Sequence, residues 1–336
     1  MILVTGGTGL VGAHLLYSLI NNGEKVRAIH RKSSDLEAVK NVFSFYTNEP
    51  ETLFTKIEWM VADITDVPSL IPAFNDVEYV YHCAAYISFN PRHFPVLKKV
   101  NVEGTANIVN FSLSEKVKKL CYISSIATLG NTANGGLITE ETEFNPEDDN
   151  SVYSITKHEA EMEVWRGTQE GLDAVIVHPG VILGEGIWSS ASGGILRTVS
   201  KGVKYYTTGG VGIVDVQDVA NVMILLLNSP IKNKHYILVS ENISYREFLT
   251  KIAISLNKKA PSKPIKKWVM LVFTYIDWFA NKLFKSKRKL LKATVKTLYK
   301  TRTYDGSKIE TEIDFNYTPY QKTIERVSRN YLRDFS

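Results

Sequence analysis

The chain opens with Met1-Ile-Leu-Val-Thr-Gly-Gly-Thr-Gly-Leu-Val-Gly12 and continues into Ala13-His-Leu-Leu-Tyr-Ser-Leu-Ile20. A short apolar run that ends at a glycine is typical of a buried parallel strand. The apolar residues from position 11 to position 20 recur at helical spacing. The stretch therefore predicts a strand over 1–5, a tight turn, and a helix over 12–21.

Three glycines in the predicted turn each have a physical role. Gly6 permits the sharp turn off the strand, Gly9 lets backbone N–H groups approach a pyrophosphate, and Gly12 lets the helix lie close to the strand. The positive end of the helix then faces the phosphates. Because a second strand-like run follows at 25–30, the glycines lie in the βαβ unit that a dinucleotide site requires.

Strand-like and helical runs alternate along the first half of the chain. This alternation indicates an α/β fold, a Rossmann-type doubly wound parallel sheet, with a smaller, mostly helical C-terminal substrate lobe. We expect the dinucleotide-binding domain over 1–180, with 215–230 returning to it, and the substrate lobe over 181–214 and 231–336. The predicted strands are 1–5, 25–30, 57–61, 78–83, 118–123 and 173–178, and the clearest helices are 12–21, 95–114 and 151–167.

Composition places the chain among ordinary globular proteins, with 336 residues, of which 44% are hydrophobic and 22% charged. Its two cysteines, Cys83 and Cys121, lie in apolar strand-like runs, so we expect core residues and neither a disulfide nor a metal site. No charged and apolar leader precedes the first strand, which predicts a cytoplasmic protein. No apolar run has the length of a membrane-spanning helix.

The basic residues are concentrated in one segment. Residues 258–302 hold fourteen of the 40 Lys and Arg residues but only one of the 35 Asp and Glu residues, Asp277, for a net charge of +13 against −8 elsewhere. The apolar run at 268–284 favours either a buried helix that caps a pocket or a helix on a membrane surface. An apolar run is not a nucleic-acid-binding pattern, so we expect no nucleic acid and a reversible, peripheral contact of 258–302 with anionic membranes.

The residues that follow the predicted strands are candidate ligand contacts, because ligands of such sheets bind at the carboxyl ends of strands. Arg31 and Lys32 follow the second strand, where an NAD site usually has an acid, so we expect NADP, with NAD less favoured. Asp63 follows the third strand as a candidate partner for the adenine amino group. Small residues, Ala84 and Ala85, follow the fourth strand.

Tyr153-Ser-Ile-Thr-Lys157 places a phenol and an ammonium four residues apart, on one face of a helix. A cationic neighbour lowers the pKa of a phenol and makes it a better general acid or base near neutral pH. Ser125, at the end of the fifth strand, can donate a hydrogen bond to a carbonyl oxygen. The same spacing recurs in Tyr304-Asp-Gly-Ser-Lys308, which we interpret as non-catalytic because a glycine lies inside it.

Seven motifs in order give the chain a family resemblance: Thr5-Gly-Gly-Thr-Gly-Leu-Val-Gly12, Tyr81-His-Cys-Ala-Ala85, Asn101-Val-Glu-Gly-Thr105, Ile123-Ser-Ser125, Tyr153-Ser-Ile-Thr-Lys157, His178-Pro-Gly180 and Asp215-Val-Gln-Asp-Val-Ala220. The chain resembles the extended short-chain dehydrogenases/reductases, the NAD-dependent epimerase/dehydratase family. The resemblance implies catalytic roles for Ser125, Tyr153 and Lys157. It implies, with the strand-end reasoning above, these cofactor contacts: Thr5, Gly6, Gly9, Leu10, Val11, Gly12, Arg31, Lys32, Asp63, Ile64, Ala84, Ala85, Tyr153, Lys157, Pro179 and Val181.

The resemblance leans to the dihydroflavonol reductase and 3β-hydroxysteroid dehydrogenase branch. Val26-Arg-Ala-Ile-His-Arg31 is similar to the second strand of these reductases, and His178-Pro-Gly-Val-Ile-Leu-Gly184 departs from the pattern of nucleotide-sugar epimerases. We therefore expect an NADP-dependent oxidoreductase that interconverts a carbonyl and an alcohol on an apolar small molecule. A nucleotide-sugar epimerase or dehydratase and a non-catalytic, NADP-binding regulatory module remain alternatives.

Substrate contacts are expected from two loops. The Gly- and Ser-rich stretch 184–202 predicts a mobile wall near the nicotinamide. Ser88, Phe89 and Asn90 are expected on a loop over the pocket. By analogy with the family, a homodimer would pair the helices at 95–114 and 151–167.

Overall fold

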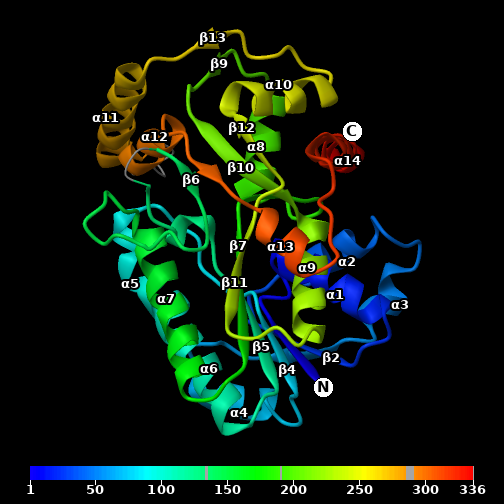
Figure 1. The fold of residues 1–336 in the computed structure, drawn as a ribbon. Helices are drawn as coiled ribbons and strands as arrows, with labels where there is room; N and C mark the ends of the chain where they lie inside the picture. Colours follow the sequence, from blue (N-terminus) through cyan, green and yellow to red (C-terminus); the bar gives the residue numbers. More distant parts are fainter. Residues whose placement is uncertain (133–134, 190, 285–290, 336) are drawn as a thin grey trace.

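Seven parallel strands form the sheet at the centre of the larger lobe, in the order β11-β7-β5-β4-β1-β2-β3 (Figure 1). The computed structural model describes residues 1–132, 135–189, 191–284 and 291–335. All six predicted strands are confirmed, and the order reverses beside β1, where loops diverge and leave room for a ligand. The strands are β1 (Ile2–Thr5), β2 (Val26–His30), β3 (Glu58–Val61), β4 (Tyr79–His82), β5 (Lys119–Ile123), β7 (Ala174–Pro179) and β11 (Lys234–Leu238).

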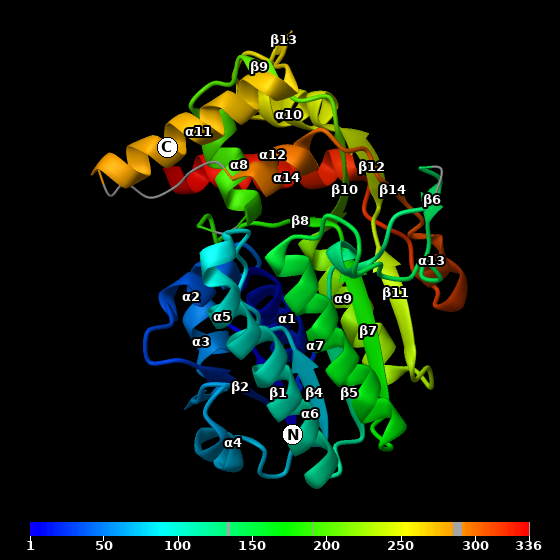
Figure 2. The ribbon, with the colours of Figure 1, turned by 90° about the vertical axis from the view of Figure 1, so that its left-hand side faces the viewer.

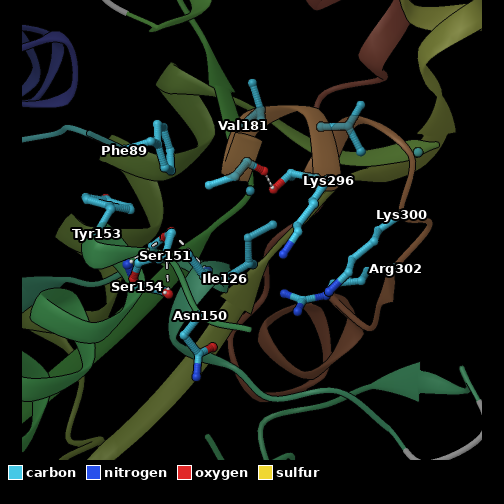
Figure 3. Close-up of a pocket in the computed structure, with 18 of the residues that line it drawn as sticks. Phe89, Ile126, Asn150, Ser151, Tyr153, Ser154, Val181, Lys296, Lys300 and Arg302 are labelled. Carbon is cyan, nitrogen blue, oxygen red and sulfur yellow. Dashed lines mark hydrogen bonds between the residues drawn. The ribbon is translucent and has the colours of Figure 1, made fainter. Parts of the chain in front are cut away.

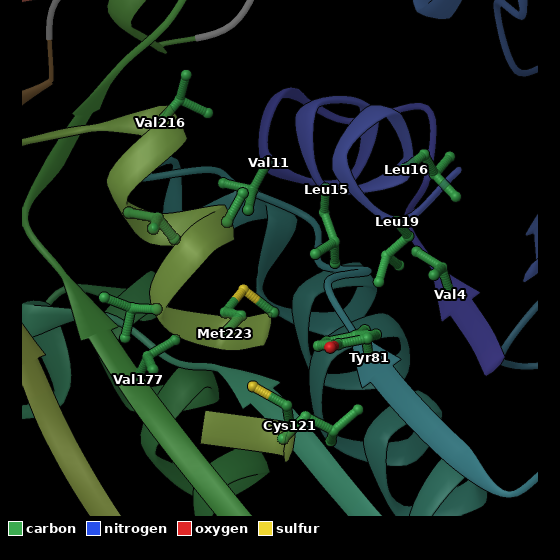
Figure 4. Close-up of a cluster of buried hydrophobic side chains, with 14 of the residues drawn as sticks. Val4, Val11, Leu15, Leu16, Leu19, Tyr81, Cys121, Val177, Val216 and Met223 are labelled. Atoms are coloured by element: carbon green, nitrogen blue, oxygen red, sulfur yellow. The ribbon is translucent and has the colours of Figure 1, made fainter. Parts of the chain in front are cut away.

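Helices cover both faces of this sheet (Figures 1 and 2). Because side chains alternate along a strand, Leu3 and Val4 of β1 enter two different core clusters. Figure 4 shows the cluster of Val4, to which α1 contributes Leu15 and α9 contributes Met223. The helices beside Val4 are α1 (Leu10–Asn21), α2 (Glu37–Phe43), α3 (Pro50–Phe54) and α9 (Val216–Asn228), and those beside Leu3 are α4 (Val67–Ala73), α6 (Gly104–Ser114) and α7 (Val152–Gln169).

The predicted helices match the structure closely. The helix expected at 12–21 is α1, and the one expected at 151–167 is α7. The run 95–114 is helical throughout, as α5 (Phe94–Leu97), a π-helical segment (Lys98–Glu103) and α6. The expected return of 215–230 to the larger lobe is confirmed, because α9 packs on α1 over the sheet.

The domain boundary expected at 231 is too early. The strand β11 pairs in parallel with β7 and so belongs to the large sheet. Its buried run Tyr236-Ile-Leu238 is a short apolar strand signal that the sequence analysis passed over. The chain therefore leaves the larger lobe only after this strand.

The smaller lobe lies over the carboxyl ends of the strands (Figure 2). Its own core includes Leu196, Phe248 and Val327, which come from three different helices. The elements of this lobe are β8 (Val181–Leu183), α8 (Ala191–Ser200), β9 (Tyr205–Tyr206), β10 (Gly210–Asp215), β12 (Glu241–Ser244), α10 (Tyr245–Ser255), β13 (Lys263–Pro264), α11 (Lys267–Phe284), α12 (Lys292–Leu298), β14 (Thr303–Tyr304), which pairs with β6 (Leu137–Ile138), α13 (Ser307–Glu312) and α14 (Tyr320–Phe335).

Two expectations for this lobe are wrong. Much of the stretch 184–202 is the helix α8, whose Leu196 and Val199 are buried in the lobe's core, and not a Gly-rich wall. The helix at 268–284 is not a buried cap, because Trp268 and Phe279 of α11 are 64% and 61% exposed. Among the described residues, none of the helices combines the length and the apolarity needed to cross a bilayer.

Candidate active site

A cavity of about 270 Å³ lies at the carboxyl ends of the first four strands of the sheet. Gly6 turns the chain there with φ +71, which a side chain would strain. A Cβ on Gly12 would lie 2.2 Å from the carbonyl oxygen of Gly6, so α1 can approach the turn only because residue 12 is a glycine. A Cβ on Gly9 would meet only that oxygen, at 3.2 Å. The glycine cradle and the start of α1 therefore fit a dinucleotide pyrophosphate.

Seven of the sixteen expected cofactor residues line this cavity. They are Gly6, Gly9, Arg31, Asp63, Ile64, Ala84 and Ala85. Lys32 is exposed outside the wall of the cavity, and Val11 is buried in the core. Thr5 is fully buried, and its hydroxyl accepts a hydrogen bond from the Ala84 amide. The expected cofactor contacts did not include the other eight lining residues, which are Thr8, Ile29, His30, Ser34, Ala62, Cys83, Tyr86 and Val100.

A second cavity, of about 260 Å³, lies between the sheet and the smaller lobe and contains the expected catalytic serine and tyrosine (Figure 3). Ser125 follows β5, and its Oγ accepts a hydrogen bond from the Ala127 amide at 3.1 Å. That bond uses a lone pair of the hydroxyl and leaves its proton for a carbonyl oxygen or for Tyr153. Val181 lines the same cavity, whereas Pro179, at the buried end of β7, does not.

The pKa of Tyr153 contradicts the sequence expectation. Burial raises it to about 12, an interaction with the Ser125 hydroxyl opposes that rise, and Lys157 does not contribute. The reason is that the Lys157 ammonium donates to the Tyr122 hydroxyl at 2.6 Å and to the Ile123 carbonyl at 2.7 Å. In this structure Tyr153 is therefore a protonated acid across the physiological pH range.

Lys157 is the strongly perturbed cation of the site. It is 2% exposed, and burial lowers its pKa to about 7, against the opposing effects of Glu161 and Cys83. Two of its three N–H donors are taken by Tyr122 and Ile123, which leaves one for a ligand. A lysine that titrates near neutral pH is typical of a functional site.

A buried polar cluster supports the serine from behind, and the sequence analysis missed it. Glu161 accepts hydrogen bonds from Ser124 at 2.6 Å and from Thr128 at 2.9 Å. His178 lies 3.2 Å from the Ser125 carbonyl and 3.1 Å from Nδ1 of His235. The sequence did contain one indication of this cluster: Glu161 follows Lys157 by four residues, so the two side chains lie on the same face of α7. The cluster holds the Ser125 backbone in place.

Of the three residues that were expected to reach the pocket from the loop after β4, only one lines the second cavity. Phe89 lines the second cavity, with its ring edge against Tyr153 at a centroid distance of 5.5 Å. Ser88 instead bonds His93 at 2.9 Å, and Asn90 accepts from the Arg92 amide, so both hold the turn.

The second Tyr–Lys pair does not form a catalytic pair. Tyr304 lies in β14, and Lys308 points to the His235 carbonyl from α13. Because Tyr304 lies in a strand and Lys308 in a helix, the two residues do not share a helix face. However, Tyr304 also lines the second cavity, and the sequence analysis did not predict that.

The far end of the second cavity is cationic. Figure 3 shows Lys296, Lys300 and Arg302 extending toward the cavity from the side opposite Tyr153. Lys296 forms an ion pair with Asp149, the one acidic residue in the lining. The Nε of Arg302 is buried and has no hydrogen-bond partner among the described residues. The unbalanced charge therefore lies on Lys300 and Arg302.

Comparisons with known proteins agree with this geometry. Residues 2–239 match the NAD dependent epimerase/dehydratase family. A Synechocystis sp. protein provisionally named dihydroflavonol 4-reductase is 29% identical over 82% of this chain and 78% of its own. The 3beta-hydroxysteroid-dehydrogenase/decarboxylase isoform 1 of Arabidopsis thaliana is 25% identical over 96% of this chain and 78% of its own. The crystal structure of gox2253 is 26% identical, with a TM-score of 0.82 over 99% of this chain and 98% of that chain.

The family match spans most of the chain, Ser125 and Tyr153 line one cavity, and Gly6 and Gly9 line the other. The chain therefore belongs to the NAD dependent epimerase/dehydratase family, the extended short-chain dehydrogenases/reductases, and is an NAD(P)-dependent oxidoreductase of that family.

Proposed function

We propose that this protein is an NADP-dependent reductase of a carbonyl compound that has an apolar body and an acidic group. The observation that carries the proposal is the shared cavity of Ser125 and Tyr153, which adjoins the dinucleotide site and ends at Lys300 and Arg302. Apolar side chains line the space between these two ends, among them Phe89, Ile126, Val181, Val211 and Tyr245. Such a cavity fits an amphipathic molecule and not a wholly apolar one.

The residues can divide the reaction among them. The bound cofactor supplies a hydride to the carbonyl carbon. Ser125 donates a hydrogen bond to the carbonyl oxygen and stabilises its developing negative charge. Tyr153, protonated at neutral pH because burial raises its pKa to about 12, gives its proton to that oxygen. The remaining N–H donor of Lys157 binds a ligand hydroxyl or the tyrosinate that forms.

Cofactor preference gives the first prediction. Arg31 directly follows β2 in the wall of the dinucleotide cavity, and Lys32, Ser33 and Ser34 come after it in place of an acid, so we expect a smaller dissociation constant for NADPH than for NADH. Arg31→Ala should remove most of the difference, because a charge-assisted hydrogen bond contributes about 1.5–3 kcal/mol, roughly tenfold or more. Lys25→Ala, at the other end of the strand, is the matched control. Equal affinity of the unaltered protein for both cofactors would refute the preference.

Substrate charge gives the second prediction. A linear aldehyde with a terminal carboxylate should be reduced with a lower KM than the uncharged aldehyde of equal length. Arg302→Gln should raise the KM of the acidic aldehyde about tenfold or more and leave the neutral one nearly unchanged, because one charge-assisted bond is lost. Arg329→Gln, on the exposed side of α14, controls for lost charge. A KM that rises equally for both aldehydes would contradict an acid-binding role.

The experiment that tests the function is consumption of NADPH with a panel of aldehydes and ketones, acidic and neutral. A nucleotide-sugar epimerase would interconvert sugar nucleotides without net change of the cofactor, and its diphosphate would also fit Lys300 and Arg302. Sugar nucleotides therefore belong in the panel. Binding of NADPH without turnover of any compound would indicate the regulatory module instead.

A further inference from the structure

The helix α11 exposes large apolar side chains that an ordinary surface helix would bury. Its outward face carries Trp268, Val272, Tyr275, Ile276 and Phe279, which are 48–64% exposed and recur at helical spacing. The less exposed positions of the helix are Val269, Met270, Leu271 and Asp277, and Thr274 is buried at 1% exposure. A surface helix normally places its apolar residues against the core. A contiguous apolar face of this kind on a monomer marks an interaction surface.

Exposed lysines lie directly beside this apolar face. Lys263, Lys266 and Lys267 precede or begin α11, and Lys258 and Lys259 lie shortly before them, all exposed. Lys292, at the start of α12, lies over the Tyr275 ring at 4.5 Å. Among the described residues, the acidic member of this segment is Asp277, which is only partly exposed. The surface is therefore apolar at its centre and cationic at its edge.

We propose that α11 and its flanking lysines form a docking surface for an anionic phospholipid bilayer. Two tryptophans on one helix, Trp268 and Trp278, suit the boundary between headgroups and acyl chains. Each lysine near an anionic surface contributes about 1 kcal/mol, and salt weakens that attraction. A second copy of this chain fits less well, because a two-fold contact through α11 would bring the two sets of lysines together.

The position of α11 connects this surface to the reductase pocket. The helix packs against α12, which supplies Lys296 and Thr297 to the cavity of Tyr153 (Figures 1 and 2). Docking would place the cationic end of that cavity near the bilayer, where an amphipathic substrate collects. This last step rests on the proposed function, whereas the docking itself does not.

The test is cosedimentation of the full chain with vesicles of phosphatidylcholine alone or mixed with phosphatidylglycerol, at low and high salt. We expect the protein to pellet with anionic vesicles at low salt and several-fold less at high salt or with neutral lipid. The double variant Ile276→Ser, Phe279→Ser should lose most of the binding. Its control is Ile71→Ser, Ile254→Ser, which removes two equally exposed isoleucines elsewhere.

The outcomes separate the docking proposal from the proposed function. Lys266→Gln with Lys267→Gln should weaken binding to anionic vesicles and not change turnover of a water-soluble aldehyde. No pelleting at low salt, or equal loss in the α11 variant and its control, would overturn the docking surface. A dimer that gel filtration detects and that the α11 variant abolishes would also overturn the proposal, because a second copy of the chain would then cover the apolar face. Turnover in the absence of vesicles tests the reductase independently.

Discussion

Tyr153→Phe is expected to lower kcat for carbonyl reduction by about 10²–10⁴-fold, the range that general acid catalysis contributes. The variant loses only the phenolic hydroxyl, so the ring still packs against Phe89 at the mouth of the cavity. NADPH binding should stay nearly unchanged, because the glycine cradle lies at the other cavity. Single-turnover kinetics and a cofactor titration measure the two effects separately.

The matched control is Tyr205→Phe, which removes the same hydroxyl from a side chain that is 52% exposed on β9. It should retain full turnover. Tyr304→Phe is a second comparison, with a much smaller loss expected than for Tyr153→Phe, since Ser125 interacts with the Tyr153 hydroxyl and Arg302 with the Tyr304 hydroxyl. Full activity in Tyr153→Phe would show that another group supplies the proton.

A fall in kcat/KM for reduction above about pH 7 is expected from Lys157, not from Tyr153. The profile of kcat/KM reports the free enzyme, in which the pKa of Lys157 is about 7 and that of Tyr153 about 12. If the enzyme is active with Lys157 as the ammonium, kcat/KM should fall about tenfold per pH unit above the Lys157 pKa of about 7. Lys157→Met should be slow at every pH and lack this break. A profile of the unaltered enzyme that stays flat to pH 9 would contradict the assignment.

The same pKa makes a prediction about stability. Because folding lowers the Lys157 pKa from 10.5 to about 7, the unfolded chain binds one more proton between these values. The free energy of unfolding should therefore rise with pH across that window, by about 1.4 kcal/mol per unit, and the cost of burying the ammonium is fully present below pH 7. Urea unfolding at pH 7 and pH 9 should show the unaltered protein gaining about 2–3 kcal/mol relative to Lys157→Met. An unchanged difference would mean that the buried amine keeps its ordinary pKa.

Local sequence was enough to predict the larger lobe. Six of its seven strands were predicted as short apolar runs with turn residues between them, and such runs form buried parallel strands wherever they lie in a chain. The seventh strand was missed because Lys234–Leu238 follows α9, within a segment assigned to the other lobe. Gly6, Gly9 and Gly12 were predictable because their role depends on backbone geometry within one βαβ unit.

The sequence also identified Ser125, Tyr153 and Lys157, because motif spacing on a strand end and a helix records which residues share a face. The sequence alone could not give the pKa values of Tyr153 and Lys157. Spacing suggested that Lys157 lowers the pKa of Tyr153, but Tyr122 and Ile123 hold the ammonium and burial raises that pKa. Desolvation and hydrogen bonding depend on the neighbours that the fold brings in from elsewhere.

The sequence by itself determined the Rossmann-type sheet and the glycine turn, and it named a serine, a tyrosine and a lysine as candidate catalytic residues, since each depends on residues close together in the chain. Only the tertiary structure decided that Lys300 and Arg302 face the cavity of Tyr153, and that the apolar side of α11 faces outward. Hydrophobic periodicity shows that a helix has an apolar face, but not which way that face points. That direction depends on what the rest of the chain packs against the helix, and in this protein α12 packs against it.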